Sequence, residues 1–368
     1  HPISTEWEAE FNKLMEAHRD SLDFDKPLEP LTPPSDLHQS ETPKFDQDGL
    51  PILGPYAFAE SGNKYLESSP NLSLLEDAKA LLENNGLLSK ATLLLEAAIQ
   101  KDELGEGGYE AWVLLGKTRI MDEQEGAGMR ALAEGVRKAE ESGTPGPGML
   151  SLAISYTNES YDRASHIMLL RWLRARFPSH TIPDETWHTV RSSSTWDAHN
   201  RITEVFLKLA RSQHQEGTVD ADVQLALGVL FYTNNEYGRA ADCFKSALSV
   251  RPQDYLLWNR LGVSLASGDK PEEALNAYRE ALQLQPTYTR AVYNVGVACL
   301  NLQAYKEAAE HFLSALETQE ITTADTSEEL WKILRRAFTK MDRSDLVELS
   351  KPGLKPDLEV FRQEGFDF

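Results

Sequence analysis

Cysteine is scarce in this chain: only Cys243 and Cys299 occur among its 368 residues. Both fall within helical patterns and lie far apart in sequence, so a disulfide framework and a cysteine-based zinc site are excluded. Such cysteine usage is typical of a reducing compartment.

Basic residues are also few, with 37 Lys and Arg against 58 Asp and Glu and a net charge of −21. A surface that neutralises nucleic-acid phosphates needs clustered positive charge, so that class is excluded as well.

Long apolar runs and familiar catalytic motifs are missing too. We find no run long enough to cross a bilayer and no secretory signal peptide. The sequence has no phosphate-binding glycine loop, no HExxH and no GxSxG, and its nine histidines show no metal-ligand spacing. We therefore expect a protein that is not an enzyme and that needs neither metal nor cofactor. Because the chain begins at His1 without a methionine, we expect it to be a fragment.

A repeat of 34 residues is prominent in the second half of the chain. Glycine, alanine and aromatic residues recur with this period in three successive units. The positions are Gly228, Gly262 and Gly296; Ala240, Ala274 and Ala308; Phe244, Tyr278 and Phe312; and Ala247, Ala281 and Ala315. Each unit is predicted to be two antiparallel helices, in which small residues allow close approach and the aromatic side chain fills the gap. Pro252 and Pro286 are expected to end the second helix.

These repeats are of the tetratricopeptide (TPR) kind and predict an all-α superhelix of about seven units, the fourth degenerate. Residues 1–71, rich in Pro, Ser, Asp and Glu, are expected to form a largely extended or disordered N-terminal arm. The two TPR halves are predicted at 72–181 and 220–322. Between them, Pro, Ser and scattered Trp break the pattern at 182–219, which we interpret as a degenerate repeat or hinge. Residues 323–368 are expected to form a C-terminal helical cap.

Polar side chains occur on the first helices of these units. Arg290 and Asn294 are four residues apart and share one helix face, and Asn259 lies at a similar height on the preceding first helix. Taken singly, an Asn on such a helix is more often solvated surface than ligand contact. Converging donors on adjacent repeats favour instead a peptide-binding groove, in which they could bond a terminal carboxylate, a group that accepts about four hydrogen bonds. One repeat position, five residues after the glycine position, is occupied by Asn158, Ser267 and Asn301.

Three phrases resemble the receptor family for the type-1 peroxisomal targeting signal: SLAISYTNES, DYLLWNRLG and TRAVYNVGVACLNL. The likeness covers roughly 72–322 and is most specific over 147–160 and 222–316. It implies an import receptor whose TPR groove binds the C-terminal Ser-Lys-Leu-like tripeptide of cargo proteins. It also implies a protein of the cytoplasm that cycles to the peroxisomal membrane and matrix.

The resemblance further implies a role for each matching residue. The terminal carboxylate and peptide backbone would be bonded by Asn158, Asn259, Asn294 and Asn301, and Arg290 would add positive charge. The basic penultimate side chain would lie beside Thr157 and Glu159, and it would be attracted by Asp122, Glu123 and Glu125. The edge of the pocket would hold Tyr237 and Arg260. Ser267 departs from the family, which usually has Asn there, so one amide contact to the peptide is replaced by a shorter hydroxyl.

The N-terminal WEAEF resembles another feature of that family, the Trp-x-x-x-Phe/Tyr pentapeptide that docks as a short helix onto peroxisomal membrane docking proteins. Trp7 and Phe11 would be its anchors. The competing interpretation is a stray amphipathic turn or a cap on the repeat array. The position of WEAEF in an acidic arm favours docking.

Two other functions of such repeats stay open. One is an adaptor that binds the acidic C-terminus of a chaperone through a carboxylate clamp, with Lys or Arg at position 5 and Asn at position 9 of the first helix. The clamp pattern is missing, since the three regular units have Leu225, Asn259 and Tyr293 at position 5 and Val229, Val263 and Val297 at position 9. The other is a relative that binds ion-channel tails through a similar pocket.

Overall fold

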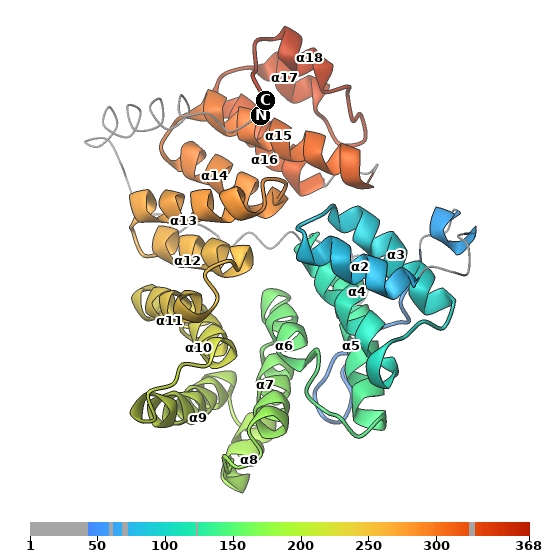
Figure 1. Ribbon diagram of the computed structural model, residues 1–368. Helices are drawn as coiled ribbons and strands as arrows, with labels where there is room; N and C mark the ends of the chain where they lie inside the picture. Colours follow the sequence, from blue (N-terminus) through green and yellow to red (C-terminus); the bar gives the residue numbers. More distant parts are fainter. Residues whose placement is uncertain (1–42, 59–61, 68–72, 123, 324–327) are drawn as a thin grey trace. The chain divides into compact units, whose positions relative to one another are not determined.

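The computed structural model describes residues 43–58, 62–67, 73–122, 124–323 and 328–368. Within these residues the chain is helical, and extended pairing is limited to one isolated bridge between Phe45 and Pro51. The helices follow one another as antiparallel pairs joined by short turns (Figure 1). The predicted all-α repeat fold is thereby confirmed.

Contacts divide the described residues into two compact units. The N-terminal unit ends at Leu257, and the C-terminal unit runs from Trp258 to Phe368. The N-terminal unit holds α2 (Leu74–Glu83), α3 (Leu88–Gln100), α4 (Glu110–Met121), α5 (Glu125–Glu141), α6 (Met149–Asn158), α7 (Asp162–Arg176), α8 (Asp184–Ser192), α9 (Thr195–Gln215), α10 (Ala221–Thr233) and α11 (Tyr237–Val250). The boundary falls within α12 (Tyr255–Ser267), and the C-terminal unit continues with α13 (Pro271–Leu284), α14 (Thr289–Asn301), α15 (Tyr305–Thr323), α16 (Glu328–Lys340), α17 (Ser344–Leu349) and α18 (Glu359–Gln363).

The repeated glycines are the places where the two helices of a pair touch. A Cβ atom built on Gly228 would lie 2.5 Å from Cε1 of Phe244, well inside contact distance. The equivalent distances are 2.4 Å for Gly262 and Tyr278 and 2.6 Å for Gly296 and Phe312. The aromatic ring therefore occupies the space that a side chain would need, and the 34-residue pairing of glycine with an aromatic residue is a packing requirement.

The turn inside each pair has a fixed geometry as well. Two residues after the last residue of the first helix, the backbone adopts a positive φ of 60–61° at Ser160, Asn235, Asp269 and Gln303. A single residue in this left-handed region reverses the chain and stops the first helix. Residues at the end of each first helix are consequently held at equivalent places, among them Asn158, Ser267 and Asn301.

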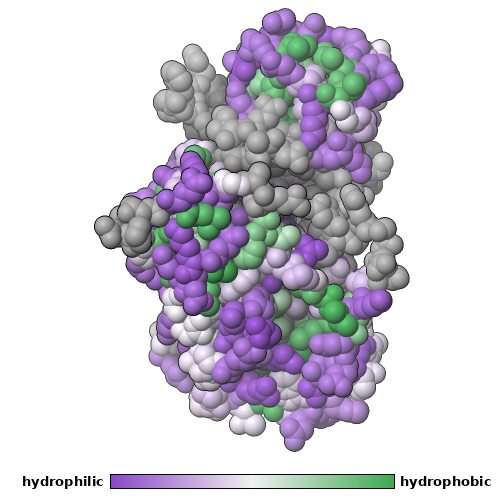
Figure 2. Space-filling view, turned by 90° about the vertical axis from the view of Figure 1, so that its right-hand side faces the viewer, coloured by the Kyte–Doolittle hydropathy of each residue, from purple (hydrophilic) through white to green (hydrophobic). Residues whose placement is uncertain are grey.

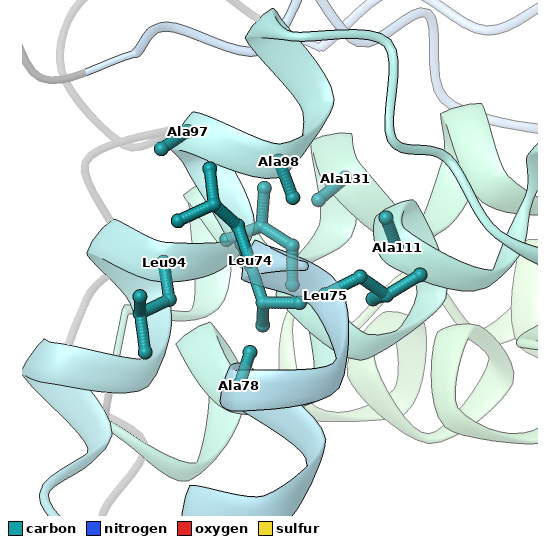
Figure 3. Close-up of a cluster of buried hydrophobic side chains, with 10 residues drawn as sticks. Leu74, Leu75, Ala78, Leu94, Ala97, Ala98, Ala111 and Ala131 are labelled. Carbon is teal, nitrogen blue, oxygen red and sulfur yellow. The ribbon is translucent and has the colours of Figure 1, made fainter. Parts of the chain in front are cut away.

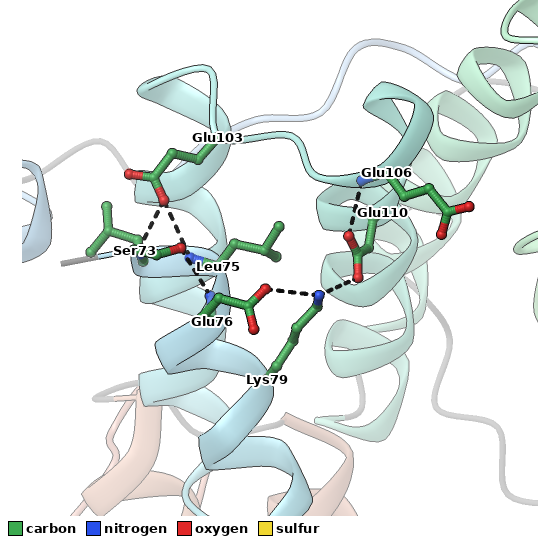
Figure 4. Close-up of polar contacts among 8 residues, drawn as sticks. Ser73, Leu75, Glu76, Lys79, Glu103, Glu106 and Glu110 are labelled. Atoms are coloured by element: carbon green, nitrogen blue, oxygen red, sulfur yellow. Dashed lines mark hydrogen bonds and ion pairs between the residues drawn. The ribbon is translucent and has the colours of Figure 1, made fainter.

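The first two pairs share a small-residue core. Leu74, Leu75 and Ala78 of α2 pack with leucines and alanines of α3, α4 and α5 (Figure 3). Polar side chains near the starts of helices in the same pairs form hydrogen bonds and ion pairs with one another and with backbone N–H groups (Figure 4). The Ser73 hydroxyl accepts a hydrogen bond from the backbone N–H of Glu76 at 3.3 Å and caps α2.

Segments outside the regular repeats also take up definite structure. Residues 43–58 fall in the predicted arm; they turn back on themselves at 46–49, where the Phe45–Pro51 bridge closes the turn, and otherwise lack regular structure. They pack on helices of the N-terminal unit, and η2 (Lys64–Glu67) follows them. The predicted degenerate repeat or hinge at 182–219 contains α8 and the 21-residue α9, whose start is capped by Ser194. Trp7 and Phe11 lie outside the described residues.

The face seen in Figure 2 is largely hydrophilic, with separate smaller hydrophobic areas. Among the described helices, none combines the length and the apolar character needed to cross a bilayer.

Candidate functional site

Two asparagines of the C-terminal unit meet across neighbouring first helices. Asn259 lies on α12 and Asn294 on α14, and the Asn294 Nδ2 donates to Asn259 Oδ1 at 2.9 Å. Asn259 is only 4% exposed, and its Nδ2 approaches the Tyr288 hydroxyl at 3.5 Å. Each side-chain amide has two N–H donors, so the pair keeps donor capacity after bonding to itself. The structure thus joins two of the side chains that the sequence predicted to converge.

Positive charge accompanies this amide pair. Arg290 lies one helical turn before Asn294 on α14, and Arg260 follows Asn259 on α12. Both arginines are half-buried. A guanidinium carries its charge at every accessible pH and offers five donors, which suits a carboxylate. The remaining predicted residues of this unit lie at the ends of first helices, where Ser267 is half-buried and Asn301 is exposed.

A second polar cluster forms in the N-terminal unit, around Glu125. This residue begins α5, is 7% exposed, and its Oε1 accepts hydrogen bonds from the Ser155 hydroxyl and from Asn158 Nδ2. The distance to Asn158 Nδ2 is 3.1 Å. Two phrases that are separate in the sequence, MDEQE and TNES, are therefore linked by a direct contact.

The other predicted residues of this unit differ in how they are placed. The Thr157 hydroxyl lies 2.7 Å from the Ser165 hydroxyl and 3.2 Å from the carbonyl of Ala153, so it is anchored to α6 and α7. Glu159 caps the end of α6 and is 5% exposed. Asp122 caps the end of α4, whereas Glu123 lies outside the described residues.

Tyr237 is held by its own turn. It begins α11, and its hydroxyl donates to Asn235 Oδ1 at 2.8 Å. Within the N-terminal unit, the structure does not bring it into the hydrogen-bonded cluster around Glu125.

Three partners of these clusters were not predicted from the sequence. Ser155 hydrogen-bonds to Glu125, and Ser165 hydrogen-bonds to Thr157. The Tyr288 hydroxyl accepts from Asn259. Ser155 precedes Asn158 by three residues, which places both on one face of α6 and is the signal that could have found it. Ser165 and Tyr288 have no such signal, because neither lies one helical turn from a predicted site residue on the same helix.

A pocket of about 150 Å³ lies beyond Thr157, between the α6–α7 turn and helices α9 and α10. His166, 5% exposed, lines it, and burial together with the nearby His199 and Arg163 lowers the pKa of His166 to about 4. This imidazole is therefore neutral at physiological pH.

The two cysteines show no sign of reactivity. Burial raises the pKa of the Cys243 thiol and of the Cys299 thiol to about 12, which leaves both protonated and weakly nucleophilic at neutral pH. Among the described residues, no group of three or more His, Cys, Asp or Glu side chains is arranged to hold a metal ion.

Comparison with known proteins places the repeats and the chain in context. The family model described as tetratricopeptide repeat matches residues 225–288 and 265–320. Three fungal relatives carry the name peroxisomal targeting signal receptor. The protein of Candida albicans is 42% identical over 322 residues, that of Eremothecium gossypii is 40% identical over 321, and that of Debaryomyces hansenii is 39% identical over 326.

These alignments cover 85% of the present chain in each case. They cover 53%, 53% and 52% of the respective relatives, so the chain spans about half the length of the proteins it matches.

Proposed function

The chain belongs to the peroxisomal targeting signal receptor family, and on that premise we propose that its repeats bind the C-terminal Ser-Lys-Leu-like tripeptide of peroxisomal matrix proteins. The observation that carries the proposal is the contact between Asn259 and Asn294 at 2.9 Å, with Arg290 one turn away. Two neutral amides and a guanidinium on neighbouring first helices supply hydrogen-bond donors and one positive charge. A terminal carboxylate is the ligand group that such a set suits best.

The cluster around Glu125 would serve the penultimate side chain. Lysine at that position carries an ammonium group, which gains from a nearby carboxylate. Asn158 belongs to this cluster because its Nδ2 bonds Glu125, and in the proposal its other N–H and its carbonyl oxygen bond the peptide backbone. Thr157, Glu159 and Asp122 belong to the same proposal as neighbours of that side chain. For Glu123 the proposal rests on the sequence alone.

The remaining predicted residues have supporting roles in the proposal. Further contacts to the peptide would come from Ser267, Asn301, Tyr237 and Arg260. Trp7 and Phe11 would dock the loaded receptor onto peroxisomal membrane docking proteins, and the protein would cycle between the cytoplasm and the peroxisome. The docking role of Trp7 and Phe11 is supported by the WEAEF pentapeptide in the sequence.

Fluorescence polarisation with a labelled peptide ending in Ser-Lys-Leu tests the central claim. We expect micromolar or tighter binding, and we expect amidation of the C-terminus to remove most of it. Leaving a buried charge partner without its counterpart costs about 2–5 kcal/mol, which is at least roughly a 30-fold loss of affinity. Equal binding of the free acid and the amide would refute carboxylate recognition. A peptide with an acidic C-terminus, of the kind that chaperone adaptors bind, serves as the control and should bind weakly.

A further inference from the structure

Residues 43–58 form a strap that crosses the N-terminal unit from α7 to α4. At its start, the Phe45 ring packs edge-on against Tyr161 with centroids 5.7 Å apart. In its middle, Asp48 lies 3.5 Å from a guanidinium nitrogen of Arg171. At its end, the Tyr56 ring meets Trp112 of α4 at 5.9 Å. The strap therefore has aromatic contacts at both ends and a charged contact between them.

The Tyr56 hydroxyl enters a buried ion pair. It donates to Glu96 Oε1 at 2.6 Å and accepts from Arg119 Nε at 2.8 Å, while Arg119 Nη2 lies 2.7 Å from the same Glu96 oxygen. The Glu96 side chain is 1% exposed and that of Arg119 is 14% exposed. Two charges in such surroundings need every available hydrogen bond, so the tyrosine hydroxyl fixes the orientation of the guanidinium.

The Arg119 guanidinium continues the chain of contacts toward the candidate site. Its Nη1 donates to Gln124 Oε1, and the Gln124 backbone N–H donates to the Arg119 carbonyl at 2.8 Å. Gln124 is the residue directly before α5, and its own carbonyl accepts the first hydrogen bond of that helix, from the Gly128 N–H at 2.9 Å. The next residue is Glu125, which holds Asn158.

We infer that Tyr56 is a positioning residue for the lysine-selective part of the peptide site. Its hydroxyl orients the Arg119 guanidinium, and that guanidinium bonds the Gln124 side chain. Gln124 directly precedes α5 and so fixes the position of Glu125, the first residue of that helix. This inference rests on the proposed function and adds to it a determinant of specificity that lies in the segment preceding the repeats. The strap thereby acts on peptide selection without touching the peptide.

The test measures selectivity instead of affinity alone. Affinities of the whole chain are determined for two peptides, one ending in Ser-Lys-Leu and one in Ser-norleucine-Leu, whose penultimate side chain lacks the ammonium group. Tyr56→Phe should lower the ratio of the two affinities at least threefold and leave the norleucine peptide within twofold of its original affinity. A general loss of folded protein reduces both affinities equally and leaves the ratio unchanged.

A double-mutant cycle with Gln124→Ala identifies the route. Both single variants should lower the ratio, and the Tyr56→Phe, Gln124→Ala double variant should lower it no further than the stronger single change, because the two residues act in series. Additive effects would overturn the relay. Tyr65→Phe is the matched control, since no hydrogen bond of its hydroxyl occurs among the described residues, and it should leave the ratio unaltered.

The outcomes separate this inference from the proposed function. If the unaltered chain binds neither peptide, the proposed function fails and the inference fails with it. If it binds both peptides equally, there is no lysine selectivity to position and the inference is wrong. If it prefers the lysine peptide and Tyr56→Phe retains the full preference, the inference alone is overturned.

Discussion

The two polar clusters use asparagine on a first helix in opposite electrostatic settings. In the C-terminal unit, Asn294 donates to the neutral oxygen of Asn259, with Arg290 nearby. In the N-terminal unit, Asn158 donates to the carboxylate of Glu125. The first cluster combines amide donors with an arginine one turn away on α14, and the second holds a carboxylate. The same residue type at a helix face thus bonds a neutral amide in one unit and a carboxylate in the other.

The second helix pair also differs from the regular repeats in what its glycine packs against. A Cβ on Gly116 of α4 would lie 2.8 Å from the backbone nitrogen of Leu132 and 2.9 Å from the carbonyl oxygen of Gly128. The three atoms nearest to a Cβ on Gly262 all belong to the ring of Tyr278, the closest at 2.4 Å. A ring can turn aside, whereas backbone atoms of a packed helix cannot. The regular repeats consequently have more tolerance at this position than the second pair.

The largest expected effect follows from this difference in packing. Gly116→Ala should lower the free energy of unfolding by about 2–3 kcal/mol, and Gly262→Ala by about 1–2 kcal/mol, because overpacking forces neighbours to move. Urea unfolding followed by circular dichroism measures both. Gly238→Ala is the control: its Cβ would meet nothing within 4 Å, and we expect it to be neutral or slightly stabilising. A larger loss at Gly262 than at Gly116 would contradict the comparison.

The next effect concerns the amide pair. Asn294→Ala should weaken binding of the Ser-Lys-Leu peptide at least about tenfold, because it removes a donor and leaves the buried Asn259 oxygen without its partner. The loss should be the same for the norleucine peptide, since we propose that this cluster binds the terminal carboxylate. Fluorescence polarisation measures both affinities, with helicity checked by circular dichroism. The exposed Asn276→Ala in α13 is the matched control, and an unchanged affinity of Asn294→Ala would move the carboxylate site elsewhere.

The smallest effect concerns the acidic cluster. Glu125→Gln keeps an oxygen that accepts from Ser155 and Asn158 but removes the charge, so the preference for lysine over norleucine should fall about three- to fivefold, or less than about 1 kcal/mol. Glu134→Gln, on the same helix and paired with Arg137, changes the net charge equally and should not alter the preference. Equal weakening of both peptides by Glu125→Gln would mean that Glu125 acts through Asn158 and not through its charge.

Much of the fold could be predicted from the sequence because its repeat is local. Gly262 and Tyr278 lie within one 34-residue unit, and their contact recurs at Gly228 with Phe244 and at Gly296 with Phe312. The convergence of Asn259 and Asn294 follows from the same period, since adjacent first helices lie side by side. The first units were harder to predict from the sequence, because Gly116 packs against Leu132 and backbone atoms and not against an aromatic ring.

The sequence by itself determined the helical pairs, the positions that face the neighbouring first helix, and the kinds of side chain found there. Tertiary structure alone decided that Asn158 bonds Glu125 and that Tyr56 reaches Arg119, contacts that join residues 33 and 63 positions apart. The reason is physical: a periodic pattern reports what each helix buries, whereas a single hydrogen bond between distant segments leaves no periodic trace. The placement of the strap on the N-terminal unit therefore had to be seen in three dimensions.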